Sequence, residues 1–137
     1  MPHLHRIFSN NRYSNFGELA ETFSRRLLNE FGQEGEACVV CNSATSGLSG
    51  TLIASGCTGS VIVPAFTFPA TYGAVYAAGL KPLLMDVNLE TWAIRPEDLD
   101  DMLQKSGAKA VILVTPFGLK TDFSSHILSA ANTERQS

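Results

Sequence analysis

A long stretch of the chain, from Ala37 to Leu80, carries no charge. It holds no Asp, Glu, Lys, Arg or His, although charged residues make up 17% of the 137-residue sequence. A stretch of this kind belongs in a protein interior, in a membrane or around a bound ligand. Pro64 and Pro69 would break a single membrane-spanning helix into pieces. We therefore expect a protein interior and no membrane span.

The remaining composition fits one globular domain. Hydrophobic residues make up 45%, the net charge is −3, and the basic residues are scattered, which argues against a nucleic-acid partner. The first residues lack the pattern of a secretory signal. Three cysteines, Cys38, Cys41 and Cys57, cannot all pair, which indicates reduced thiols and a cytoplasmic location. We expect Cys38 and Cys41 to be buried apolar side chains, because no second pair completes a zinc site with them.

Hydrophobic periodicity predicts one helix behind a polar, irregular arm at residues 1–14, and then strands and helices in alternation. Asn15 is expected to cap the first helix and Gly32 to end it, with apolar side chains from Phe16 to Phe31 on one face. The expected strands cover 37–41, 61–63, 82–87 and 110–114, and the later helices cover 46–55, 68–78, a segment from Pro96, and 122–131. Their inward side chains are expected to be Leu48, Leu52, Ile53, Leu99, Met102, Leu103, Phe123, Ile127 and Leu128.

These strands are almost wholly apolar, as is typical of a parallel sheet buried on both faces. The sequence therefore predicts an α/β fold with three layers: a mostly parallel sheet of about four strands with helices on both faces. We expect an N-terminal arm at 1–14, one domain at 15–131 and a polar tail at 132–137.

We expect the ligand-binding residues just after the carboxyl ends of two predicted strands. Asn42 to Gly47 is a turn of small polar residues that enters a helix, and a helix N-terminus attracts anions. Thr45 and Ser46 would add hydroxyl donors, while Ala44 keeps the backbone accessible. The same pattern also describes ordinary helix capping, so both interpretations stay open. Glycines in the following helix, Gly47 and Gly50, predict a close neighbour there.

The next strand end carries Phe68. Its ring either stacks on an aromatic ligand or belongs to the core, and the local pattern leaves both open.

Several of these motifs together are similar to those of a known family. They are Tyr13-Ser14-Asn15-Phe16-Gly17, Asn42 to Leu48, Val61 to Thr71, Gly79 to Pro82 with Asp86-Val87, and Phe117-Gly118. At this spacing the chain resembles the nucleotide-sugar aminotransferases of the DegT/StrS type, which carry pyridoxal phosphate on the fold type I scaffold. The resemblance implies that residues 15–131 are part of the family's large domain. Gly59-Ser60 and Thr115-Pro116 depart from the family pattern.

The resemblance also assigns roles. Thr45 and Ser46, with Ala44, would hold the cofactor phosphate, and Phe68 would stack on the pyridine ring. The Schiff-base lysine and the acid that pairs with the pyridine nitrogen would lie beyond the matched motifs, so we expect a truncated relative that is inactive alone and has no catalytic residue of its own. The alternatives are a working transaminase within a longer product or beside a complementing chain, and an anion-binding or assembly module. A nucleotide sugar is expected as substrate only for a complete protein.

The resemblance further implies that strands absent from this chain separate strand 37–41 from the rest, and that one of them separates strand 110–114 from strand 61–63. The four strands must then close up into a smaller sheet by pairing directly with one another, or pair with strands of another chain. We therefore expect a homo-oligomer, such as an intertwined dimer, or a complementing chain.

Overall fold

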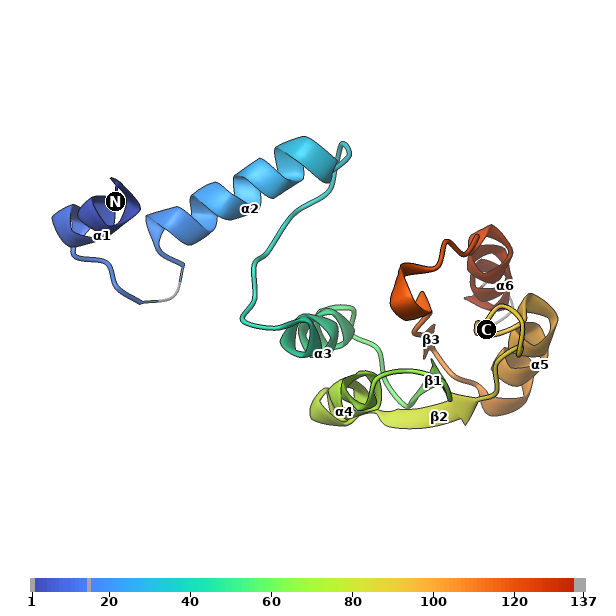
Figure 1. Cartoon of the computed structure of the whole chain (residues 1–137). Helices are drawn as coiled ribbons and strands as arrows, with labels where there is room; N and C mark the ends of the chain where they lie inside the picture. The colour runs from blue at the N-terminus through green and yellow to red at the C-terminus, as the bar shows by residue number, and fades with distance from the viewer. Residues whose placement is uncertain (1, 15, 135–137) are drawn as a thin grey trace. The chain divides into compact units, whose positions relative to one another are not determined.

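The fold comes from a computed structural model that describes residues 2–14 and 16–134 (Figure 1). The chain divides into two compact units, Met1–Asn42 and Ser43–Ser137, and each is described by itself.

The first unit holds two helices, α1 (Pro2–Asn10) and α2 (Glu18–Phe31). The prediction that residues 1–14 are irregular is therefore wrong, because most of them form α1. Helix α2 begins after Gly17, and the predicted cap, Asn15, lies outside the described residues. Gly32 ends α2 as predicted, and its backbone N–H donates to the Leu28 carbonyl at 2.8 Å.

The predicted apolar face of α2 packs less than the sequence indicates. No residue of α2 is buried, and the rings of Phe16, Phe23 and Phe31 are exposed.

The segment 37–41 is not a strand, so that prediction is wrong. A strand needs a neighbour that completes its hydrogen bonds, and the described residues of this unit contain no other strand. Val39 is 76% exposed as a result. The prediction that Cys38 and Cys41 are buried is wrong too, since Cys41 is exposed while Cys38 is half-buried.

The second unit is built on three parallel strands, β1 (Ser60–Pro64), β2 (Lys81–Met85) and β3 (Ala110–Val111), in the order β2-β1-β3. Three strands replace the predicted four. β1 also pairs directly with β3, so the strands close up here with no other strand between them, which is one of the two alternatives expected from the sequence.

Strand β3 ends early because a proline in the neighbouring strand β1 lacks a hydrogen-bond donor. The Ile112 N–H still donates to the Ile62 carbonyl at 2.9 Å. The next bond of a parallel ladder would need the N–H of Pro64, which proline lacks. On the other side of β1 the ladder to β2 continues, and the Ala65 N–H donates to the Met85 carbonyl at 2.7 Å.

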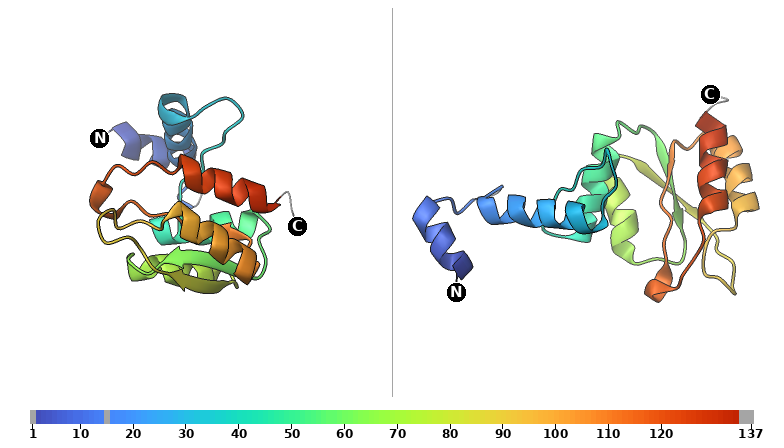
Figure 2. Two further views of the ribbon diagram at one scale, coloured as in Figure 1. Left: turned by 90° about the vertical axis from the view of Figure 1, so that its right-hand side faces the viewer. Right: turned by 90° about the horizontal axis from the view of Figure 1, so that it is seen from above.

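Helices cover both faces of this sheet, as predicted (Figure 2). Helices α3 (Ala44–Ala54) and α4 (Pro69–Ala77) cover one face, and α5 (Pro96–Ser106) and α6 (Ser124–Glu134) cover the other. Alternation along β1 supplies both cores. Val61 and Val63 pack in a cluster with Leu52, Val75, Leu80 and Ile112, and Ile62 packs in a cluster with Met85, Ile94, Leu99, Leu103 and Ala108.

The predicted inward faces are correct for α5 and only partly correct for α3 and α6. Leu52 is buried, whereas Ile53, Ile127 and Leu128 are each more than 60% exposed. In α6, His126 and Ser129 are buried instead. A methyl group added at Gly50 would meet no atom within 4 Å, so the close neighbour predicted there is absent.

Among residues 2–14 and 16–134, no helix is both long and apolar enough to cross a bilayer.

Candidate functional site at the carboxyl edge of the sheet

Two helix N-termini lie side by side at one edge of the sheet. Helix α4 follows β1 directly, so it begins at the carboxyl edge. Helix α3 leads into the amino end of β1, so its own N-terminus also points to the carboxyl edge. The Ser49 hydroxyl of α3 lies 3.1 Å from the carbonyl oxygen of Ala74 in α4 and 3.1 Å from that of Thr45 in its own helix, so its one proton is shared between the two acceptors.

This contact marks which residues of the two helices lie at the same level. Ser49 is the sixth residue of α3, which begins at Ala44, and Ala74 is the sixth residue of α4, which begins at Pro69. Because both helices rise at the same rate per residue, their first turns are level. The structure thereby places Ala44, Thr45 and Ser46 beside the start of α4, where Phe68 lies.

The start of α3 is a capped helix N-terminus. The Ser43 hydroxyl accepts the Ser46 N–H at 3.2 Å and lies 3.0 Å from the Ser46 hydroxyl. The Gly47 N–H donates to the Ser43 carbonyl at 3.0 Å. The N–H groups of Ala44 and Thr45 belong to the first turn, where no helical carbonyl can accept them. Ala44 and Ser46 are exposed and Thr45 is half-buried, so an anion can reach this turn.

Phe68 caps α4 and is 77% exposed, which excludes the core interpretation of its ring. It lines an uncharged pocket of about 480 Å³. Three threonines, three phenylalanines and three further apolar residues form the walls: Thr67, Thr71, Thr115, Phe66, Phe68, Phe117, Pro69, Val114 and Pro116. The hydroxyls of Thr67 and Thr71 lie 2.8 Å apart and bond to each other.

Three rings form a cluster beside this pocket. The ring centroids of Phe66 and Trp92 are 5.5 Å apart, those of Trp92 and Phe117 are 5.7 Å apart, and those of Phe66 and Phe117 are 6.4 Å apart. Sequence reasoning assigned no role to Trp92, and it used Phe117 only as part of a motif. Nothing in the spacing of these residues signals their contact, because it depends on two turns with left-handed backbone.

None of the described lysines lines this pocket. Lys81 begins β2 and Lys109 precedes β3, so both lie at the amino edge of the sheet. Lys105 pairs with Asp101 on α5 at 3.1 Å, and Lys120 lines a different pocket. That pocket, of about 620 Å³, also borders His126, whose Nε2–H donates to the Ile94 carbonyl at 2.7 Å, while its buried Nδ1 has no partner among the described residues.

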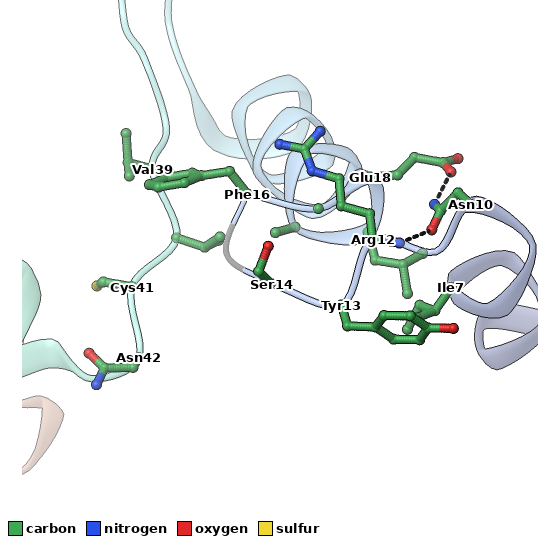
Figure 3. Close-up of a pocket in the computed structure, with 14 residues that line it drawn as sticks. Ile7, Asn10, Arg12, Tyr13, Ser14, Phe16, Glu18, Val39, Cys41 and Asn42 are labelled. Atoms are coloured by element: carbon green, nitrogen blue, oxygen red, sulfur yellow. Dashed lines mark hydrogen bonds between the residues drawn. The ribbon is translucent and has the colours of Figure 1, made fainter.

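A larger pocket of about 890 Å³ lies within the first unit (Figure 3). Asn10 makes two hydrogen bonds in its wall: its amide donates to Glu18 at 3.2 Å, and its carbonyl oxygen accepts the Arg12 N–H at 3.0 Å. None of the predicted site residues lines this pocket. Within the described part of the chain, no group of three or more His, Cys, Asp or Glu side chains is arranged to hold a metal ion.

The residues at the carboxyl edge fit a phosphorylated aromatic cofactor. An anion fits the first turn of α3, with its free N–H groups and hydroxyls. A flat ring fits the adjacent pocket, with its exposed phenylalanine rings and threonine hydroxyls. The two features are neighbours because the first turns of α3 and α4 are level.

The chain is similar to known aminotransferases along nearly its whole length. A model of the DegT/DnrJ/EryC1/StrS aminotransferase family matches residues 1–134. The chain is 32% identical over 88 residues to UDP-2-acetamido-2-deoxy-3-oxo-D-glucuronate aminotransferase of Pseudomonas aeruginosa, a match that covers 63% of this chain and 24% of that protein.

Solved structures agree. DesI, solved in the presence of its TDP-sugar product, superposes with a TM-score of 0.84 and 28% identity over 96% of this chain and 33% of that chain. NtdA from Bacillus subtilis, solved with bound cofactor PMP, shares the fold with a TM-score of 0.81 and 23% identity over 96% of this chain and 30% of its own. This chain thus spans a quarter to a third of the length of these relatives. It belongs to the DegT/DnrJ/EryC1/StrS aminotransferase family.

Proposed function

We propose that residues 1–137 hold the phosphate and ring of a vitamin B6 cofactor but do not transfer amino groups by themselves. The observation that carries this proposal is that the first turns of α3 and α4 lie side by side at the same level, as the 3.1 Å contact between Ser49 and Ala74 indicates. It makes the anion-attracting turn at Ala44, Thr45 and Ser46 a neighbour of the exposed ring of Phe68.

In this proposal each residue acts by binding and orienting. The N–H groups of Ala44 and Thr45 and the hydroxyls of Thr45 and Ser46 donate to the phosphate, and the helix dipole adds to the attraction. Phe68 offers a face for the pyridine ring. When bound, pyridoxal phosphate supplies an electron sink for reactions at the amino-bearing carbon.

The position of the lysines supports the second half of the proposal. Amino-group transfer on this cofactor uses a lysine as nucleophile and proton carrier. Lys81 and Lys109 lie at the opposite edge of the sheet, Lys105 is engaged with Asp101 on α5, and Lys120 lines a different pocket. Transfer to a sugar therefore becomes possible within a longer polypeptide or beside a complementing chain.

Binding is tested best with pyridoxamine phosphate, which has the same ring and phosphate but cannot bond covalently to a lysine. Equilibrium dialysis against the whole chain should give saturable binding that Thr45→Val and Ser46→Ala both weaken. Thr51→Val is the matched control, because Thr51 lies on the same helix about two turns from its start, where its hydroxyl donates to the Gly47 carbonyl at 2.9 Å. Equal binding by all four proteins would contradict the assigned phosphate site.

Two further outcomes separate the remaining alternatives. If inorganic phosphate binds as tightly as pyridoxamine phosphate, the site is a general anion module and not a cofactor site. If the purified chain transfers an amino group to a keto sugar by itself, the inactive interpretation is wrong.

Assembly and location remain predictions. We propose a homo-oligomer or a complex with a complementing chain, in the cytoplasm, without a nucleic-acid partner. Light scattering of the purified chain tests the first of these, and a monomer at all concentrations would leave only the complementing chain.

A further inference from the structure

In the described part of the second unit, the residues other than glycine that have a left-handed backbone, Trp92 and Phe117, lie close together. Trp92 has a φ of 55° and Phe117 a φ of 54°, values in the left-handed region that residues other than glycine seldom adopt. The two residues lie on different loops, yet their ring centroids are only 5.7 Å apart. Strained residues of this kind persist where the surroundings hold them, and they concentrate at binding sites.

Hydrogen bonds hold each loop in its strained form. The Trp92 N–H donates to the Asn88 carbonyl at 2.8 Å, and the Asn88 N–H donates to the Ala93 carbonyl at 2.9 Å. The Asn88 side chain accepts the Glu90 and Thr91 N–H groups at 2.8 and 3.0 Å. This tight turn holds the backbone of Trp92 in its left-handed conformation.

The second loop is the short helical turn η1 (Pro116–Gly118), where the Leu119 N–H donates to the Pro116 carbonyl at 3.0 Å. Phe117 is 84% exposed, so burial does not explain why its ring is held. Its ring makes an edge contact with Trp92 and a tilted contact with Phe66. Phe117 also lines the same uncharged pocket as Phe68.

We propose that Phe117 is the second aromatic wall of the ring site, and that Trp92 and Phe66 position it. The proposal deepens the function given above and rests on it, since the flat ligand is the ring of the B6 cofactor. Phe117 contacts the ligand, while Trp92 acts only through Phe117 and is a positioning residue. Aromatic pairs favour offset or edge contacts at these separations, and such contacts orient a ring as well as attract it.

The experiment separates the ring of Phe117 from its backbone. Phe117→Gly relieves the left-handed strain and removes the wall, whereas Phe117→Tyr keeps an aromatic wall. With pyridoxamine phosphate as the probe, we expect binding by Phe117→Gly to be roughly fivefold weaker than wild type and binding by Phe117→Tyr to equal it. Inorganic phosphate should bind all three alike, because it needs only the start of α3.

The role of Trp92 is tested by rescue. Trp92→Ala should weaken pyridoxamine phosphate binding to a similar degree and diminish the circular dichroism that the bound ring acquires, while Trp92→Phe should restore both. Far-ultraviolet circular dichroism shows whether each variant is folded. If Trp92→Ala does not fold, Phe117→Gly still tests the aromatic wall, because that substitution relieves the backbone strain.

The outcomes separate the two proposals. If wild type does not bind pyridoxamine phosphate, the proposed function and this inference both fall. If wild type binds it and Phe117→Gly binds equally well, only the aromatic wall is wrong. If Phe117→Gly weakens binding but Trp92→Ala does not, Phe117 needs no support and the positioning role of Trp92 is wrong.

Discussion

Replacing Leu99 by alanine tests whether this short chain keeps a two-sided core. Leu99 lies on α5, its side chain is 0% exposed, and it packs in the cluster around Ile62, on the face of the sheet opposite α3 and α4. Losing three buried carbons removes their transfer free energy and leaves a cavity, which together cost about 2–5 kcal/mol. We take the upper half of that range, because the residues around Leu99 are themselves buried on a sheet that cannot collapse easily.

The chain offers a matched control. Leu89 lies on the loop before α5 and is 89% exposed, so Leu89→Ala makes the same chemical change without a cavity. Its expected effect is within about 0.5 kcal/mol of zero.

Urea unfolding followed by tryptophan fluorescence measures both variants, since Trp92 is the single tryptophan. A sucrose-containing buffer keeps the folded state measurable if the wild type is marginal, because excluded osmolytes favour burial. Equal midpoints for Leu99→Ala and Leu89→Ala would mean that α5 does not pack on the sheet in solution, and the three-layer description would fail.

Two further changes address the start of α3 and the start of α6. Ser43→Ala removes the side-chain acceptor of the Ser46 N–H, which is 3.2 Å away; urea unfolding should show a loss of about 1 kcal/mol, and an unchanged midpoint would refute the capping role. The hydrogen bonds that Asp122 accepts from the Ser124 hydroxyl and backbone N–H lower the pKa of Asp122 from 3.8. A carboxyl whose pKa is lower in the folded state stabilises the protein above its unfolded pKa, and that contribution is lost as pH falls through the folded pKa. Asp122→Asn should therefore be less stable than wild type at neutral pH, and the difference should shrink as the medium becomes acidic; a difference that does not depend on pH would contradict this assignment.

Local chemistry made most of the second unit predictable. Val61, Ile62 and Val63 form an uninterrupted β-branched run, so β1 and its burial on both faces followed from the sequence. Pro96 with its following acids marked the start of α5. In the first unit, Gly32 marked the end of α2. The family resemblance gave the fold class correctly, and the turn to which it assigned the phosphate lies at the start of α3.

Three features escaped sequence reasoning for physical reasons. Residues 37–41 have strand composition but lack a neighbouring strand. Local sequence does not determine which segments pair through hydrogen bonds. Strand β3 was predicted too long because its end depends on Pro64, which lies on the opposing strand. His126 faces inward on α6 where an apolar residue was expected, and its hydrogen bond to Ile94 joins residues far apart in the chain.

The site was predictable only in part. Thr45, Ser46 and Phe68 each mark a helix start, but their adjacency depends on the register between α3 and α4. The ring cluster was not predictable, because neither Trp92 nor Phe117 signals a left-handed backbone in the way that glycine does.

The central claim is that the first turn of α3 receives the phosphate of a B6 cofactor. Nitrogen-edited NMR of the whole chain during a titration with pyridoxamine phosphate tests it most directly. We predict that the backbone amide signals of Ala44, Thr45 and Ser46 show the largest phosphate-dependent shifts, and that pyridoxamine without phosphate leaves them in place. Unchanged signals at these three amides at saturating ligand, or larger shifts elsewhere in the chain, would contradict the claim.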